Sequence, residues 1–314
     1  MKKITLIAAA IAALGVSAQA SAAFTATPIV FDMNGSAAGG AISVTSFDWL
    51  PGNALAKDAI GSTTGVFTTY FQATLNSFTF NNGGTTTTVS PTAGTEFTVQ
   101  ATIIEQGIVG GVSSSFVSLG GTYKIFYDSS ADSNDITGLG YDDGIKILEG
   151  TINLGGTGTF TNFSLISPQF FPNVNLDNFG NNDAAGILSN QGSGSSNLFV
   201  DVTYTDSNFF KSNIKSLNVD LNDASNLTAP FNQANPSDEV VGQTPNYGVG
   251  VVGGVLVPVN GAGCGDVAVG TTCDFHFQSD SATSFQATVP EPGSLAIAGA
   301  GLALMSLVRR RKAK

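Results

Sequence analysis

The chain has little charge, few cysteines and almost no histidine. Only 11% of its 314 residues are charged, acidic residues outnumber basic ones 23 to 12, and there is one histidine. The apolar fraction of 42% together with the low charge excludes wholesale disorder. The shortage of basic residues argues against a nucleic-acid partner, because such proteins need a basic surface. Two cysteines leave room for at most one disulfide.

The first 23 residues have the composition of a secretory signal peptide. Two lysines at positions 2 and 3 precede Ile4–Val16, an uncharged and mostly apolar run. This run is too short to span a bilayer comfortably. Small residues follow at the positions that a signal peptidase needs. We therefore expect export by the Sec machinery and cleavage by signal peptidase after Ala20, Ala22 or Ala23.

The other end of the chain has three parts in a fixed order. A Pro-Glu-Pro motif comes first, the uncharged stretch Gly293–Val308 follows, and a basic end closes the chain at residues 309–314. The pattern predicts a short transmembrane helix over residues 294–308, whose basic flank stays in the cytoplasm. The motif comprises Val289, Pro290, Glu291 and Pro292, and the basic stop comprises Arg309, Arg310, Arg311 and Lys312.

This tail, from residue 287 to the end, resembles the PEP-CTERM sorting tail of proteins exported by Gram-negative bacteria that make extracellular polysaccharide. The same tail is also described as an ice-binding-protein C-terminal motif. The resemblance implies exosortase, a membrane transpeptidase, as a partner that removes the helix and passes the protein onward. It further implies a transient inner-membrane precursor and a final location on the outer surface or in the extracellular matrix. A plain tail anchor does not explain the Pro-Glu-Pro motif.

Removal of both ends leaves five lysines and no arginine against 22 acidic residues, because Glu291 leaves with the tail. Such a surface repels nucleic acid, anionic lipid and acidic polysaccharide unless divalent cations bridge them.

The densest acidic cluster makes Asp128, Asp132 and Asp135 candidate Ca²⁺ ligands. They do not form an EF-hand, because Ser133 replaces the turn glycine and Leu139 the final glutamate. A solvated acidic turn is the alternative, and no other cofactor is expected.

Between the two ends, the sequence alternates with period two. Phe97, Val99, Ala101 and Ile103 share one face of a predicted strand, and Leu198, Val200, Val202 and Tyr204 share one face of another. Further strands are expected within Phe67–Phe80, Gly121–Asp128, Gly144–Leu154, Gly158–Ile166 and Tyr247–Val259, and loops over Asn181–Asn197 and Ala229–Gly248. We predict one all-β body over residues 24–286, an antiparallel β-sandwich or jelly-roll-like fold. A flattened barrel and a β-solenoid stay open, although the lack of a fixed-period repeat counts against the solenoid.

Cys264 and Cys273 are expected to form a disulfide, because export places them in an oxidising compartment. His276 follows closely, but a zinc site would need further soft ligands. The period-two pattern places His276 on the solvent face of a late strand. A catalytic triad would have to use this one histidine, and no G-x-S-x-G elbow supports it.

Paired carboxylates could in principle cleave a sugar chain, and the candidates are Glu96, Glu105 and Glu149. Strand ends also carry solvated acids for no chemical reason. We therefore predict that the protein is not an enzyme. A secreted carbohydrate-binding module and a polysaccharide hydrolase on a β-sandwich stay as alternatives.

The body is similar to flocculation-associated PEP-CTERM proteins, which help floc-forming bacteria adhere in an exopolysaccharide matrix. The residues that carry this scattered resemblance are Ser46–Ala56, Phe71–Leu75, Asp274–Asp280 and Phe285. It implies a role in exopolysaccharide-associated adhesion or flocculation, with exopolysaccharide as a partner and no catalytic residues.

Overall fold

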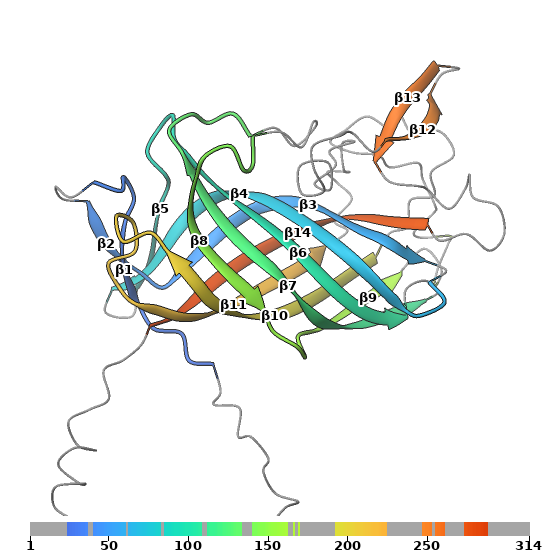
Figure 1. Ribbon diagram of the computed structural model, residues 1–314, viewed down its shortest axis with the longest axis horizontal. Helices are drawn as coiled ribbons and strands as arrows, with labels where there is room; N and C mark the ends of the chain where they lie inside the picture. The colour runs from blue at the N-terminus through green and yellow to red at the C-terminus, as the bar shows by residue number, and fades with distance from the viewer. Residues whose placement is uncertain are drawn as a thin grey trace, which may run out of the picture.

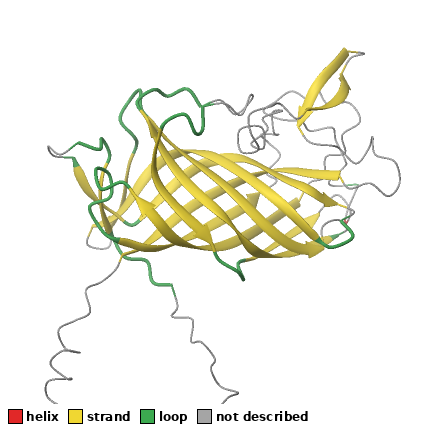
Figure 2. Ribbon diagram, viewed as in Figure 1, coloured by secondary structure: helices red, strands yellow, loops and turns green. Residues whose placement is uncertain are grey.

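The computed structural model describes residues 24–36, 40–60, 62–82, 85–108, 112–133, 140–162, 166, 169, 192–224, 247–252, 255–260 and 273–287. The elements named within these ranges are all β-strands, and their pairings are antiparallel (Figure 2). The prediction of an antiparallel all-β fold is therefore confirmed.

The main sheet closes on itself. The strands of the ring, in spatial order, are β11 (Ile214–Ala224), β14 (Cys273–Ala287), β3 (Ser46–Ile60), β4 (Val66–Asn82), β6 (Glu96–Ile108), β7 (Ser113–Asp128), β8 (Ile145–Ile152) and β10 (Gly192–Thr205). The ring is complete because β10 also pairs with β11 (Figure 1). The predicted sandwich is not confirmed, because this pairing joins the strands into an eight-stranded barrel.

Shorter strands complete the barrel wall and one of its ends. β9 (Thr157–Asn162) continues the line of β8 along the wall. Beyond the end of β8, it lies between β7 and β10 and pairs with both. β5 (Thr85–Val89) pairs with the end of β4. β1 (Ile29–Asp32) pairs with β2 (Ala41–Val44) at one end of the barrel (Figure 1). A separate hairpin joins β12 (Tyr247–Val252) and β13 (Val255–Asn260).

The barrel interior is apolar and its outer face is polar. Along β10, Leu198 and Val200 are buried, whereas Phe199 and Asp201 between them are exposed. Successive side chains of a strand point to opposite faces, so this alternation assigns one face to the core. The end of the barrel next to β1 is filled by phenylalanines: the Phe31 ring lies 4.9–6.3 Å, centroid to centroid, from five others.

A small polar cluster crosses the interior. The Trp49 indole N–H donates to Thr283 Oγ1 over 2.9 Å, and the Tyr123 hydroxyl lies 2.6 Å from the same oxygen. All three residues are buried, and they come from β3, β14 and β7. These hydrogen bonds satisfy groups that would otherwise be costly to bury, and burial raises the pKa of Tyr123 above its ordinary value.

β3 contains a proline and a glycine that would end most strands. Pro51 is exposed, and the register between β3 and β4 shifts between Trp49 and Asn53. Proline is tolerated at such an irregularity because it has no N–H to donate to the ladder. A Cβ on Gly52 would lie 2.2 Å from the Gln72 carbonyl oxygen, so this approach of two strands requires glycine.

Several expectations from the sequence differ from this fold or lie outside the described residues. The predicted loop Asn181–Asn197 is wrong over its last six residues, because β10 begins at Gly192 and pairs there with both β9 and β11. The strand predicted over Tyr247–Val259 is a hairpin. No helix in the described ranges is long and apolar enough to cross a membrane. The predicted signal peptide and the tail helix over residues 294–308 lie outside those ranges.

Candidate functional site

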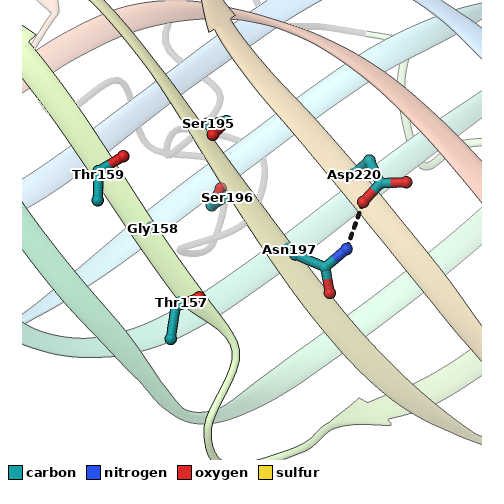
Figure 3. A pocket seen from close by; sticks show the side chains of 7 residues that line it. All are labelled: Thr157, Gly158, Thr159, Ser195, Ser196, Asn197 and Asp220. Carbon is teal, nitrogen blue, oxygen red and sulfur yellow. Dashed lines mark hydrogen bonds between the residues drawn. The ribbon is translucent and has the colours of Figure 1, made fainter. Parts of the chain in front are cut away.

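A polar groove of about 470 Å³ lies on the barrel wall at β9, β10 and β11 (Figure 3). The groove is lined by Thr157, Gly158, Thr159, Ser195, Ser196, Asn197 and Asp220. Ser195 is the register partner of Thr159, and Asn197 is the partner of both Thr157 and Asp220. Three strands therefore bring short hydroxyl, amide and carboxylate side chains into neighbouring positions.

Asp220 is held in the groove by two amides. Asn197 Nδ2 donates to one carboxylate oxygen (Figure 3), and Asn218 Nδ2 donates to the other over 3.1 Å. Because both amides use their N–H groups on Asp220, their oxygens remain as acceptors. The Asn218 Oδ1 atom is buried and has no hydrogen-bond partner among the described residues.

An aromatic side chain stands beside this groove. Phe199 is 40% exposed and follows Asn197 by two residues, so it lies on the same outer face of β10. Its ring lies 6.4 Å from that of Phe24, centroid to centroid. Hydroxyl and amide groups next to an exposed aromatic ring suit a polyhydroxylated ligand, which offers hydroxyls for hydrogen bonding and C–H faces for packing.

The acidic loop between β7 and β8 forms a second polar cluster. Carboxylate oxygens of Asp128, Asp132 and Asp143 lie within 4.8 Å of one another. Glu96 Oε1 anchors the loop by accepting the N–H groups of Asp132 and Ser133 over 3.0 and 2.9 Å. Partial burial raises the pKa of Asp143, and the charges of Asp132 and Asp128 raise it further.

This loop brings together two of the three predicted Ca²⁺ ligands. Asp128 and Asp132 meet, Asp143 joins them, and Asp135 lies outside the described residues. Oxygen-only donors are the kind that Ca²⁺ takes, but exposed acidic groups are common without an ion. Calcium binding therefore stays a prediction.

The three candidate glutamates occupy three different environments. Glu96 is buried against the acidic loop. Glu105 is buried and accepts a hydrogen bond from Thr69. Glu149 forms an ion pair with Lys146, whose hydrogen bond lowers the pKa of Glu149. Each of the three carboxylates thus has a different partner.

Other predicted site residues are not described. Cys264 and the sorting tail lie outside the described ranges, and of Cys273 and His276 only the backbone is described, within β14. The disulfide therefore stays a prediction.

The sequence analysis missed the Asn197–Asp220 pair, because it placed Asn197 in a loop. The signal was present: polar residues at 193, 195 and 197 continue the period-two pattern of the following apolar run.

Comparison with known proteins identifies the tail. The described body is a closed antiparallel β-barrel with a polar groove on its wall. Residues 288–312 match the family model of the PEP-CTERM protein-sorting motif, which confirms the resemblance of the tail. The motif implies exosortase as the processing partner and export to the cell envelope or surface. No curated protein and no solved structure matches the chain.

Proposed function

We propose that this is a surface or extracellular-matrix protein that binds exopolysaccharide through the groove on β9, β10 and β11, and so acts in adhesion or flocculation. The sorting motif supports the location, because it implies export to the envelope or surface. The observation that carries the binding proposal is the row of hydroxyl and amide side chains beside the exposed Phe199.

The groove suits a neutral polysaccharide better than an acidic one. Its one charged lining residue is Asp220, and the rest of the lining is hydroxyl, amide or glycine. Sugar hydroxyls can donate to the amide oxygen of Asn197 and can accept from the threonine and serine hydroxyls of the groove. The acidic excess of the body adds a general repulsion against uronate or sulfate groups.

The test is binding of the mature protein to the exopolysaccharide of its own host, measured by co-sedimentation and calorimetry. The double variant Asn197→Ala/Asp220→Ala should weaken binding by about tenfold or more, which corresponds to roughly 1.4 kcal/mol for one lost cluster of polar contacts. A matched control exists on β3 and β4, where Asn76 Nδ2 donates to Asp48 Oδ2 over 2.8 Å. Asn76→Ala/Asp48→Ala should bind like the wild type.

A second pair of variants tests the aromatic contact. Phe199→Ala should also weaken binding, whereas Ile104→Ala removes a comparably exposed apolar side chain elsewhere on the barrel and should not. Equal affinities for all four variants and the wild type would mean that the groove is not the binding site.

The same assay separates binding from catalysis. We propose that the polysaccharide is bound without turnover, so new reducing ends should not accumulate. Robust release of sugar that Glu105→Gln or Glu149→Gln abolishes would favour the hydrolase alternative. Saturable binding without release, and without any effect on cell adhesion, would favour a carbohydrate-binding module of another role.

A further inference from the structure

The sorting motif follows the barrel almost without a linker. β14 ends at Ala287, and the family match begins at residue 288. Pro290 is the third residue after Ala287. An extended chain spans at most about 3.6 Å per residue, so Pro290 lies within roughly 11 Å of Ala287. Whatever enzyme binds residues 290–292 therefore works close to the barrel surface.

The end of β14 is hydrogen-bonded to neighbours on both sides, so it adds little to the distance between the barrel and the sorting motif. Ala287 pairs with Ile214 of β11, and its N–H donates to Thr27 Oγ1 over 2.7 Å. Thr27 N–H in turn donates to the Phe285 carbonyl over 2.8 Å. β3 begins at Ser46, opposite Ser284, so Thr27 takes over as the neighbour of β14 beyond that point.

An exposed lysine projects beside this junction. The register between β11 and β14 shifts between Ile214 and Ser216, so Lys215 is the extra residue of a β-bulge opposite Gln286 and Ala287. Bulges redirect side chains at strand ends. Lys215 is exposed and is one of only five lysines between the signal peptide and the tail. A cation therefore stands next to the cleavage region of a body that is otherwise strongly acidic.

We propose that this tail-proximal end of the barrel, formed by Thr27, Lys215 and Ala287, is a contact surface for exosortase. The proposal rests on the exosortase processing that the motif implies. An enzyme that encloses the Pro-Glu-Pro peptide must approach within the reach of residues 288 and 289, so it meets the barrel end. Lys215 supplies the charge by which an acidic surface of the enzyme recognises the folded body.

The experiment follows conversion of the full-length precursor to the mature form by pulse-chase in an exosortase-positive host. Lys215→Glu should slow conversion by about threefold to fivefold, the usual scale for one exposed charge pair. Lys57→Glu makes the same charge change near the other end of β3 and should convert at the wild-type rate. Both mature variants should show the wild-type melting temperature, which excludes misfolding as the cause.

A second variant changes the spacing between the barrel and the sorting motif. A flexible Gly/Ser insertion of about 12 residues between Ala287 and Thr288 lets the enzyme bind the motif away from the barrel. In that background Lys215→Glu should no longer slow conversion. Wild-type conversion of Lys215→Glu at native spacing, or equal slowing by Lys57→Glu, would overturn the contact.

Two further experiments distinguish this proposal from a membrane contact and from a failure of the sorting function itself. A photo-crosslinking residue in place of Lys215 should yield an adduct with exosortase; an adduct with lipid alone would assign the surface to the membrane instead. Alanines at residues 290–292 should block conversion altogether. If that variant is processed normally, the sorting function itself fails, independently of what Lys215 contacts.

Discussion

The buried cluster of Trp49, Tyr123 and Thr283 should be among the most sensitive points of the barrel. Thr283→Val keeps the volume and shape of the side chain and removes its hydroxyl. The Trp49 N–H and the Tyr123 hydroxyl would then lose their partner in a fully buried site. A buried polar group left unsatisfied costs about 1–3 kcal/mol, so for these two groups we expect a loss of about 2–6 kcal/mol in the free energy of unfolding.

The assay is equilibrium unfolding in urea, followed by tryptophan fluorescence. Trp49 is the only tryptophan, and it is 1% exposed, so its emission reports directly on this cluster. Thr122→Val is the matched control, because Thr122 is exposed on the opposite face of β7. The control should change stability by less than about 0.5 kcal/mol. A Thr283→Val protein as stable as this control would refute the argument that the cluster is held by its hydrogen bonds.

Three further predictions concern the end of the barrel, the acidic loop and the cysteines. Phe31→Ala should destabilise the protein by about 3–5 kcal/mol in the same urea assay, because it empties the centre of a packed aromatic cluster. Asp143→Asn should raise the melting temperature at neutral pH and leave it unchanged at acid pH. The pKa of Asp143 is raised in the folded protein, so the ionised carboxylate destabilises the fold above that pKa. This destabilisation disappears as the pH falls through the folded-state pKa. Millimolar Ca²⁺ should cancel the advantage of this variant if the loop binds the ion. Mass spectrometry of non-reduced peptides should find Cys264 joined to Cys273, and two free thiols would contradict the disulfide.

The alternating pattern predicted strands better than it predicted how they are arranged. The run Phe97–Ile103 has a regular period of two and lies within β6, and Leu198–Tyr204 lies within β10. Closure of the barrel depends on the pairing of β10 with β11, and no local pattern encodes a pairing partner. A sandwich and a barrel therefore have the same strand pattern, and the sequence could not separate them.

The missed features have local causes. Gly192–Asn197 has no large apolar residue, so it was assigned to a loop; its place in β10 comes from two neighbouring strands that supply the hydrogen bonds. β3 has no counterpart among the predicted strands, and it contains Pro51 and Gly52, residues that normally end a strand. The groove is lined by side chains from three strands, which come together only in the folded barrel. The acidic cluster includes Asp143, which the fold places next to Asp128. The period-two pattern continues through residues 193, 195 and 197, but the contacts between strands follow from tertiary structure, which local spacing does not encode.

The most direct test of the account is the fate of the precursor in its own host. Replacing Pro290, Glu291 and Pro292 with alanine removes the sorting motif and leaves the described body unchanged. Membrane fractionation and intact-protein mass spectrometry should then find a full-length, membrane-retained precursor, whereas the wild type should be shortened and delivered to the surface. Deletion of residues 289–314 should release the body without delivery. Normal shortening and surface delivery of the alanine variant in an exosortase-positive host would contradict the account and leave a simple membrane anchor as the better explanation.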